Sequence, residues 1–380
     1  MRFRHLRLGN WRNFVHVDVP LASRVFLAGP NASGKSNLLD ALRFLHDIVA
    51  VGGGLRSAVA RRGGLSGIRC LAARHRPDVL VDVMIGNGNG GGRARWRYRL
   101  GFGADDQRLP IVKEESVWDG DSPILSRPSA EDRKDPERLR QTHLEQTNAN
   151  REFRSIAEFL GSVRYLHIVP QILRQGERSG GRSGDPFGGD FLERIASTPP
   201  RTRAARLRKI LHALEAAVPQ MRDLEVWRDK HGTPHLRGRY EHWRHNAGWQ
   251  TEDQFSDGTL RLLGLLWALL DGHGPLLLEE PELSLHTEVV RRISGIFAGI
   301  QRSRPRQIVV STHSADLLSD EGIGGDEVLL LRPSAEGTTV TAASADRQIR
   351  DLLEGGASVA DAVLPATAAE DASQLALFGE

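Results

Sequence analysis

An eight-residue stretch early in the chain has the composition of a phosphate-binding loop. Residues 29–36 read Gly-Pro-Asn-Ala-Ser-Gly-Lys-Ser and fit the pattern G-x-x-x-x-G-K-[ST] at every position. In such a loop the glycines let consecutive backbone N–H groups curve around phosphates, and the following helix directs its positive end at them. Lys35 would bring a mobile cation to the phosphate oxygens, and the Ser36 hydroxyl would ligate Mg²⁺. The stretch therefore predicts a site for nucleotide phosphates with Mg²⁺.

Acidic residues follow an apolar strand much later in the chain. Residues 276–282 read Leu-Leu-Leu-Glu-Glu-Pro-Glu, so the acids stand where a buried strand ends. In open α/β folds, ligands bind at the carboxyl edge of the sheet. Unpaired acids are costly to bury there, so a metal-binding or proton-transfer role explains them better than a structural one. We expect Glu279 to lie beside the metal and Glu280 to take a proton from the attacking water.

Two shorter segments fit the same kind of site. Phe255-Ser256-Asp257-Gly258-Thr259 directly precedes an apolar helix, so Ser256 and the next N–H groups form a second potential anion site. Residues 308–314 form an apolar strand that ends in His313, a side chain suited to contact a γ-phosphate or the attacking water. Taken alone, the first is equally an N-cap and the second a buried histidine. Their order after a phosphate loop favours the functional interpretation.

The elements that must position these residues alternate between strands and helices. A buried strand, Arg24–Ala28, leads into the loop, and a helix with apolar residues on one face follows it and ends at Gly52–Gly54. The C-terminal part of the chain has the same alternation. It predicts a helix after Phe255 and strands at Leu276–Leu278, Gln307–Ser311 and Glu327–Leu331.

The region between the two motifs is less regular. Asp78–Ile85 and Arg93–Phe102 read as a hairpin whose second strand presents arginines at 93, 95, 97 and 99 on one face. That face is either a solvated side of an antiparallel sheet or a stripe that contacts phosphates. Ser122–Asn150 is polar and reads as a mobile surface segment, whereas Val163–Val169 reads as a strand and Thr202–Val218 as a helix.

Composition restricts the class of protein. Of 380 residues, 39% are hydrophobic and 26% charged, as in a soluble globular protein, and no apolar run approaches the ~18 residues of a membrane span. The single cysteine, Cys70, excludes an internal disulfide framework and a cysteine-based zinc cluster. The N-terminus has no apolar signal segment, so we expect a cytoplasmic protein. Arginines number 46 against five lysines, and a pI near 9.3 permits nucleic-acid binding without demonstrating it.

The ordered set of motifs resembles the ABC-class ATPase head, specifically the RecF/SMC-like and OLD-like bacterial AAA-type ATP-binding proteins. Gly29–Ser36 corresponds to the Walker A motif, Phe255–Thr259 to the signature motif, Leu276–Glu280 to Walker B and Pro281–His286 to the D-loop. The resemblance covers roughly residues 1–50 and 250–335. It implies an α/β fold of the P-loop NTPase class, with a mixed central sheet, an antiparallel β subdomain and an inserted helical region.

The resemblance also implies roles for individual residues, with ATP and Mg²⁺ as cofactors. Glu280 and His313 would be catalytic, and Ser36 and Glu279 would hold the metal. In the family, the signature residues Ser256, Asp257 and Gly258 act on ATP held by a second copy of the chain. The remaining ATP-binding positions lie in the loop and near the first strands: Gly29, Pro30, Asn31, Ala32, Ser33, Gly34, Lys35, Ser36, Asn37, Arg12 and Asn13.

The sequence departs from the family pattern in two places. Glu279 stands where the family usually has Asp, and the signature reads Ser-Asp-Gly-Thr instead of Ser-Gly-Gly-Gln, as in the RecF- and OLD-like branch. No Q-loop can be placed from the motifs, and the candidate region for it is around Arg61–Ser66. The pattern predicts an N-terminal ATPase lobe at 1–120, a partly helical, loop-rich insertion at 121–250, a C-terminal lobe at 251–335, and a strand, helix and loose tail at 336–380.

Three functions are compatible with these motifs. The first is an ATPase whose nucleotide-driven homodimer gates action on DNA or on a partner effector, in repair or phage defence. The second is the nucleotide-binding subunit of a membrane transporter, although 221 residues separate Lys35 from Ser256, far more than in transporters. The third is an ATP-binding switch with negligible turnover. Only 67 residues follow His313, too few for the nuclease domain of OLD-like proteins, so an effector nuclease would be separately encoded.

Overall fold

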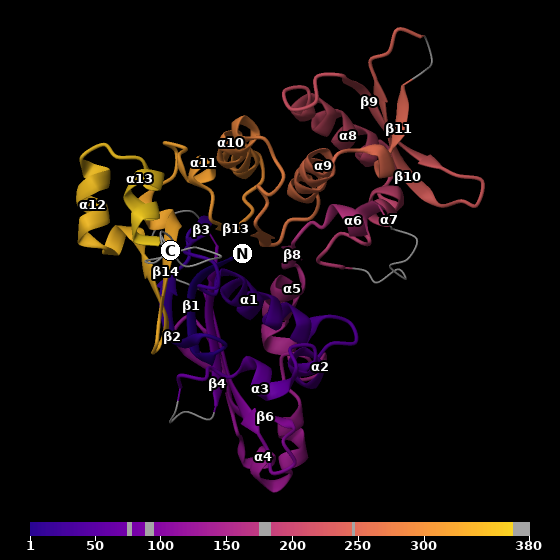
Figure 1. The fold of residues 1–380 in the computed structure, drawn as a ribbon. Helices are drawn as coiled ribbons and strands as arrows, with labels where there is room; N and C mark the ends of the chain where they lie inside the picture. The colour runs from indigo at the N-terminus through magenta and orange to yellow at the C-terminus, as the bar shows by residue number, and fades with distance from the viewer. Residues whose placement is uncertain (74–77, 88–94, 175–183, 245–247, 368–380) are drawn as a thin grey trace, which may run out of the picture.

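A six-stranded mixed sheet forms the centre of the computed structural model, which describes all residues except 74–77, 88–94, 175–183, 245–247 and 368–380 (Figure 1). The strand order is β15-β14-β3-β13-β12-β8, and all neighbours are parallel except β15, which pairs antiparallel with β14. The strands are β3 (Arg24–Ala28), β8 (Arg164–Leu166), β12 (Leu276–Glu279), β13 (Ile308–Thr312), β14 (Val328–Ser334) and β15 (Gly337–Ala342).

Both faces of this sheet are buried, each in its own hydrophobic core. Successive side chains of a strand point to opposite faces, so Leu277 and Val309 pack in one core while Leu278 and Val310 pack in the other. Because parallel strands are covered on both sides, they are nearly continuous apolar runs. Such runs allow the strands of this sheet to be predicted from the sequence. All the strands predicted for it from the sequence are present, but β8 is shorter than the predicted 163–169.

A second six-stranded sheet is entirely antiparallel, in the order β2-β1-β4-β5-β6-β7. Helix α1 (Lys35–Val49) packs between the two sheets, and its Phe44 ring contacts Trp11 and Phe102 at 5.2 Å between centroids in both cases. The strands are β1 (Arg2–Trp11), β2 (Phe14–Pro20), β4 (Val79–Gly86), β5 (Trp96–Ala104), β6 (Pro110–Asp119) and β7 (Ser122–Arg127). The predicted hairpin is therefore β4 and β5, and it continues into β6 and β7.

The arginine face of β5 is largely neutralised by acidic neighbours. Arg97 pairs with Asp82 at 2.6 Å, and Arg99 pairs with Glu114 at 2.9 Å. Arg95 lies 3.4 Å from Asp119, whereas Arg93 lies outside the described residues. These pairs favour the solvated-face interpretation over a stripe that contacts phosphates.

The remaining helices divide between the two cores: α2, α3 and α5 pack in the core that holds α1, and helices α6 to α13 pack in the core on the other face of the central sheet. A third sheet, β11-β10-β9, lies in the part of the insertion predicted to be helical and loop-rich, and the sequence analysis does not predict it. It consists of β9 (Met221–Arg228), β10 (Pro234–Tyr240) and β11 (Trp249–Thr251). The helices are α2 (Leu55–Ala60), α3 (Gly64–Ile68), α4 (Ala130–Lys134), α5 (Arg154–Gly161), α6 (Pro170–Arg174), α7 (Phe191–Ser197), α8 (Pro200–Leu214), α9 (Asp257–Leu270), α10 (Thr287–Ser303), α11 (Ala315–Leu318), α12 (Arg347–Glu354) and α13 (Val359–Val363).

The helix predicted at 202–218 begins at Pro200 and ends at Leu214, and most of the predicted loose tail, 368–380, lies outside the described residues. Within the part of the chain that is described, no helix combines the length and apolar character needed to cross a membrane.

The expectation of a mobile surface segment at Ser122–Asn150 is wrong. Arg127 ends β7 fully buried, and its guanidinium makes two bonds to Asp132, at 3.0 and 2.9 Å, and one to Glu115 at 2.8 Å. Glu115 also accepts bonds from the backbone N–H groups of His143 and Leu144, at 2.8 and 3.0 Å. Because a buried guanidinium needs these acceptors, the charged residues fix the segment to β6 instead of freeing it.

Replacement of Arg127 by Ala is expected to destabilise the protein by about 3–5 kcal/mol, since it leaves two carboxylates buried without their cation. Arg127 lowers the pKa of Asp132, so the fold uses the charged form of that carboxylate. Urea unfolding measures the change. Arg133→Ala is the matched control, because Arg133 is exposed on α4, and it should shift stability by less than about 0.5 kcal/mol. A loss of similar size in both variants would contradict the structural role of the buried cluster.

Candidate functional site

The parallel pairing of three central strands brings the sequence motifs to one edge. Strand β13 lies between β3 and β12, so the carboxyl ends of all three point the same way. Residues 29–34 follow β3, Glu280 follows β12, and His313 follows β13. Segments almost 300 residues apart in the chain thus meet at the edge where open α/β sheets bind ligands.

The loop at residues 29–36 is tightly fitted to its surroundings. Gly34 has φ 97°, and a Cβ built on it would lie 2.1 Å from the Asn13 side chain. A Cβ on Gly29 would lie 2.6 Å from Ser33 Oγ and 2.7 Å from the carbonyl oxygen of Leu331. Both positions therefore require glycine, Gly34 for its left-handed backbone and Gly29 for the close approach of β14.

Lys35 is buried beneath this loop among three carboxylates. Its ammonium donates to the carbonyl oxygens of Gly29 and Pro30, at 2.8 and 3.0 Å. Burial lowers the pKa of Lys35, and the negative charges of Glu280, Glu282 and Glu279 oppose this effect. The cation thus lies against the loop backbone, at the place where incoming phosphate oxygens would replace the two carbonyls as its partners.

Ser36 and Glu279 form a pair of oxygen donors at the start of α1. The Ser36 hydroxyl donates to one carboxylate oxygen of Glu279, and the Tyr165 hydroxyl of β8 donates to the other. Burial raises the pKa of Glu279, and the bond from Ser36 partly offsets the effect. A hydroxyl and a carboxylate oxygen side by side are donors that Mg²⁺ accepts, so these two residues fit that ion.

Glu280 occupies a special backbone position. Its φ is 42°, and its N–H donates to the backbone oxygen and the hydroxyl of Ser311, at 3.1 and 3.3 Å. His313 Nδ1 lies 3.3 Å from Glu280 Oε1, and both side chains are accessible, 46% for His313 and 26% for Glu280. The strained backbone aims a solvent-accessible carboxylate past the strand end, within reach of a histidine. Such a pair can take a proton from a water molecule.

Residues at the turn after β1 support the loop from the other side. Asn13 donates to the carbonyl oxygen of Ser33 at 2.9 Å and accepts a bond from Asn37 at 2.9 Å. Arg12 bonds Asp40 at 3.0 Å on α1. Asn13 therefore lies directly against residues 29–36, whereas the bond of Arg12 fixes the helix. The Arg61–Ser66 segment joins α2 to α3, and its Arg62 also bonds Asp40.

The signature segment lies at the start of α9. Ser256 caps this helix by accepting a bond from Thr259 N at 3.1 Å, and Arg174 holds Asp257 at 2.6 Å. A Cβ on Gly258 would lie 2.6 Å from the carbonyl oxygen of Ser284, so this glycine allows close contact with the Pro281–His286 segment. Among described residues, no hydrogen bond or ion pair joins the segment to residues 29–36.

Three residues near the site were not singled out in the sequence analysis. Tyr165 bonds Glu279, Ser311 holds Glu280, and Glu282 is buried and accepts a bond from Thr312 Oγ1 at 2.5 Å. Burial raises the pKa of Glu282. Glu282 could have been recognised from the sequence, because it is the third acid of the Glu-Glu-Pro-Glu run. Nothing in the sequence indicates Tyr165, because its contact with Glu279 depends on β8 pairing with β12.

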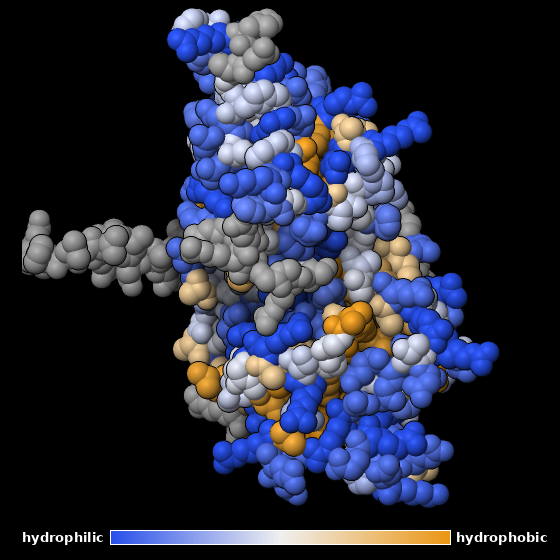
Figure 2. Space-filling model, turned by 90° about the vertical axis from the view of Figure 1, so that its right-hand side faces the viewer, coloured by the Kyte–Doolittle hydropathy of each residue, from blue (hydrophilic) through white to orange (hydrophobic). Residues whose placement is uncertain are grey.

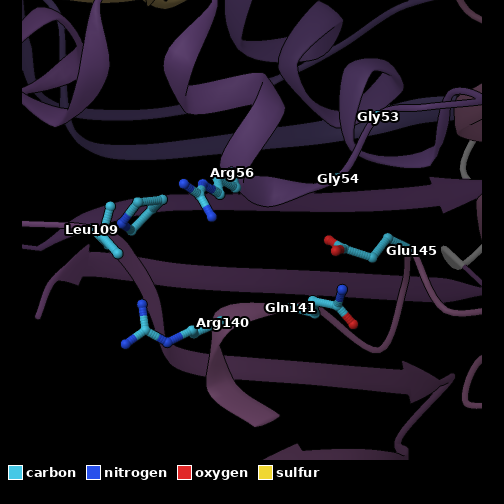
Figure 3. Close-up of a pocket in the computed structure, with 8 residues that line it drawn as sticks. Gly53, Gly54, Arg56, Leu109, Arg140, Gln141 and Glu145 are labelled. Carbon is cyan, nitrogen blue, oxygen red and sulfur yellow. The ribbon is translucent and has the colours of Figure 1, made fainter. Parts of the chain in front are cut away.

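A cavity of about 270 Å³ lies away from the candidate site, between the N-terminal end of α2 and the antiparallel sheet (Figure 3). Its Glu145 carboxylate accepts bonds from Leu55 N at 2.9 Å and Thr142 Oγ1 at 2.8 Å, so it is engaged in holding the chain. No residue of 29–36 lines it, and the cavity is separate from the candidate site. The lining residues are Gly53, Gly54, Arg56, Leu109, Pro110, Arg140, Gln141 and Glu145.

Comparisons with known proteins agree with this architecture. A family model described as "AAA domain, putative AbiEii toxin, Type IV TA system" matches residues 24–320. A DNA replication and repair protein RecF of Clavibacter sepedonicus is 37% identical over 87 residues, 22% of this chain. The match covers 21% of that protein, about a fifth of its length.

Solved structures similar to this chain are heads of SMC proteins. An SMC head bound to the C-winged helix domain of ScpA has a TM-score of 0.57 at 11% identity, covering 90% of this chain and 97% of that chain. A second structure is an SMC head domain with an extended coiled coil, derived from Pyrococcus furiosus and bound to the C-terminal domain of ScpA. Its TM-score is 0.53 at 12% identity, and the match covers 94% of this chain and 100% of that chain. These similarities confirm the fold class, a P-loop ATPase head with a mixed central sheet and an antiparallel subdomain.

Proposed function

The chain belongs to the AAA domain family whose model matches residues 24–320, and we propose that it binds ATP with Mg²⁺ and hydrolyses it to ADP and phosphate. The observation that carries this proposal is the meeting of Lys35, Ser36 and Glu279 with Glu280 and His313 at one sheet edge. These are a cation for phosphates, two oxygen donors for a metal, and an accessible carboxylate paired with a histidine. In combination they suit phosphoryl transfer to water.

Each step assigns a task to a residue of this chain. Lys35 exchanges the carbonyls of Gly29 and Pro30 for phosphate oxygens, and the N–H groups of the loop surround the same phosphates. Ser36 and Glu279 would hold Mg²⁺, which neutralises charge on the phosphates when bound. Glu280 accepts the proton of the attacking water, and His313 orients the carboxylate or the water.

We further propose that ATP drives dimerisation and that the dimer gates action on DNA or on a separately encoded effector. In this scheme residues 1–120 and 251–335 are the two ATPase lobes, 121–250 are the insertion, and 336–380 are the C-terminal part. The name of the RecF relative refers to DNA replication and repair, and the SMC heads were solved with a partner protein bound. The family description names a putative toxin of a type IV TA system, which is compatible with an effector role, and a role in phage defence is part of the proposal.

An ATP-binding switch with negligible turnover is the second candidate. Glu279 favours it, because this carboxylate is longer than the usual Asp and already bonds Ser36 and Tyr165. Measurement of steady-state phosphate release, with and without duplex DNA, separates the two candidates. Turnover supports the ATPase; nucleotide binding without turnover under either condition supports the switch.

The shared-site model predicts complementation between two damaged subunits. Lys35→Ala removes the phosphate cation of one subunit, and Ser256→Arg blocks the signature segment of the other. A mixed dimer would then contain one site damaged on both sides and one intact site. Mixing equal amounts of the two inactive variants is therefore expected to restore part of the ATPase rate.

The complementation assay needs proof that mixed dimers form. Differently tagged subunits, purified over both tags, provide it, and each variant mixed with itself is the control. Double-tagged dimers in which no ATPase rate returns would contradict independent shared sites. A normal ATPase rate in the Ser256→Arg variant on its own would show that the signature segment is not part of the site.

A further inference from the structure

Positive charge is concentrated in one part of the insertion. Residues 200–251 contain 11 Lys and Arg against five Asp and Glu, a net charge of +6. The rest of the chain contains 40 Lys and Arg against 43 Asp and Glu, so it carries a net charge of −3. Helix α8 alone contains five of the cations and no acidic residue. This distribution singles out α8 and β9–β11 as a cationic module within an otherwise slightly acidic protein.

The module projects from the body of the molecule (Figure 1). Its inner side is held by apolar side chains, among them Ile210 and Leu214 of α8 and Leu224 and Leu236 of the sheet, all of which are buried in one core. The outer side of the sheet carries the alternate residues of each strand, which are half-buried or exposed. A surface supported in this way is available to a partner without rearrangement of the fold.

Many cations of the module have no acidic partner among the residues that the structure describes. Seven of them have exposed side chains and form no ion pair within that part of the chain. The first three belong to α8, and the others follow along the sheet and its turns: Arg201, Arg208, Lys209, Arg228, Lys230, Arg239 and Arg244. A set of such cations on one projecting module favours a polyanionic partner.

Aromatic side chains on the outer face of the sheet provide stacking surfaces. The Arg237 guanidinium lies between two indoles, 5.6 Å from the Trp227 ring and 4.6 Å from the Trp249 ring. His235 lies 5.6 Å from the same Trp227 ring, across the β9–β10 pair. Trp227 is 39% exposed, although tryptophan is a residue that folding usually covers. We call Trp227, His235, Arg237 and Trp249 the stacking platform.

We propose that the stacking platform and the surrounding cations bind single-stranded nucleic acid. Unpaired bases stack on exposed indole and guanidinium planes, while Arg and Lys follow the phosphates. A duplex hides its base faces and would not use the platform. Figure 2 shows mostly hydrophilic colours at the upper end of the molecule, where this module lies.

Acids around the platform offset most of its own positive charge. Glu252 lies 2.7 Å from His235, and Asp229 lies 3.9 Å from the other nitrogen of the same ring. Glu225 bonds Arg237 at 2.7 Å and the two indoles contact its guanidinium, so this arginine holds the rings in place and the exposed Trp227 ring offers the stacking surface. Asp223 lies opposite Arg239 in the strand register and reduces its effect. Helix α8 packs against the opposite face of the sheet, so the phosphate contacts beside the platform are expected from exposed cations of the sheet and its turns, Lys230 and Arg239. The proposal does not depend on ATP hydrolysis by the chain.

The test measures binding of the full chain to a fluorescein-labelled oligothymidylate of about 20 nucleotides, by anisotropy, without ATP. Trp227→Ala is expected to weaken binding about 10-fold or more, and Trp227→Phe to retain most of it, because a smaller ring still stacks. The double variant Lys230→Gln, Arg239→Gln should lower the slope of log K against log salt by about 0.7 for each phosphate that it no longer binds. Arg347→Gln, Arg350→Gln, two exposed arginines of α12, is the matched control and should leave the slope unchanged.

The outcomes separate this proposal from the proposed function. ATPase rates close to wild type in the module variants, together with their weaker binding of the oligonucleotide, support a distinct nucleic-acid site. Equal affinity of wild type, platform and charge variants for the oligonucleotide overturns the proposal. Duplex DNA bound as tightly as the single strand, with no effect of Trp227→Ala, also overturns it. If Trp227→Ala fails to fold by circular dichroism, the double charge variant still decides, because its two exposed positions leave the sheet core intact.

Discussion

Replacement of Glu280 by Gln is expected to leave ATP binding intact and to slow hydrolysis by about 10²–10⁴-fold, the usual range for a lost general base. The amide keeps nearly the same shape, and it can still bond the water and His313. It cannot take up a proton at neutral pH. The backbone of residue 280 should not move, since its N–H bonds to Ser311 do not involve the side chain.

The Glu280→Gln variant also tests dimerisation by linkage. If ATP bridges two subunits, a variant that binds ATP without hydrolysing it should accumulate the dimer. Size-exclusion chromatography with light scattering, with MgATP and without nucleotide, measures the mass. Glu288→Gln, an exposed acid at the start of α10, is the control and should keep the wild-type rate and mass.

Two results would contradict these expectations. A Glu280→Gln rate equal to that of the wild type rules out this carboxylate as the base. An inactive variant with the same mass in both conditions contradicts ATP-driven dimerisation if the wild type is a monomer. Where the wild type is already an oligomer, cross-linking of engineered cysteine pairs near Ser33 and Ser256 reports whether ATP brings the two segments together.

Replacement of Lys35 by Ala is expected to abolish ATP binding, because the phosphates lose the cation that lies beneath the loop. The fold should tolerate the change: Lys35 is buried at a cost that lowers its pKa, and its two bonds go to carbonyl oxygens at the open end of the sheet. Calorimetric titration with ATP measures the loss. Wild-type affinity in this variant would refute the assignment of residues 29–36 as the phosphate loop.

A control for Lys35→Ala must remove an equal charge elsewhere. Lys113 is exposed on β6, so Lys113→Ala should bind ATP as the wild type does. Thermal unfolding of Lys35→Ala, with a midpoint near that of the wild type, shows that the loss of binding comes from the site. A strongly lowered midpoint together with weak binding would indicate that Lys35 is needed for folding.

The sequence determined the central sheet and the motif positions on it. Residues 24–28, 276–279 and 308–312 are short apolar runs that end in polar or glycine residues, and each is a strand with its motif at the carboxyl end. Such runs can be recognised in the sequence because both faces of a parallel sheet are buried, so most positions carry an apolar side chain. The phosphate loop can also be recognised in the sequence, because the local backbone requires glycine at Gly29 and Gly34.

Tertiary structure decided the contacts that need two distant segments. Tyr165 reaches Glu279 only because β8 pairs with β12, a strand much further along the chain. Charged residues in 122–150 read as solvated in the sequence, yet Arg127 is buried with Glu115 and Asp132. The same holds for β5, whose arginines meet Asp82 and Glu114 on neighbouring strands. A charge pattern along one segment does not specify whether an opposite charge from elsewhere will neutralise it.

The β9–β11 sheet was also decided by tertiary structure. Its strands mix charged, aromatic and glycine residues, since only one face packs against α8 and the core, and the outer face is free to be polar. Such strands lack the continuous apolar run that marked the central sheet. The stacking of Arg237 between Trp227 and Trp249 depends on strand register, because those residues are 10 and 12 positions apart in the chain and become neighbours only when β10 pairs with β9 and β11. Local sequence specifies which residues are present, and the pairing of strands specifies which of them touch.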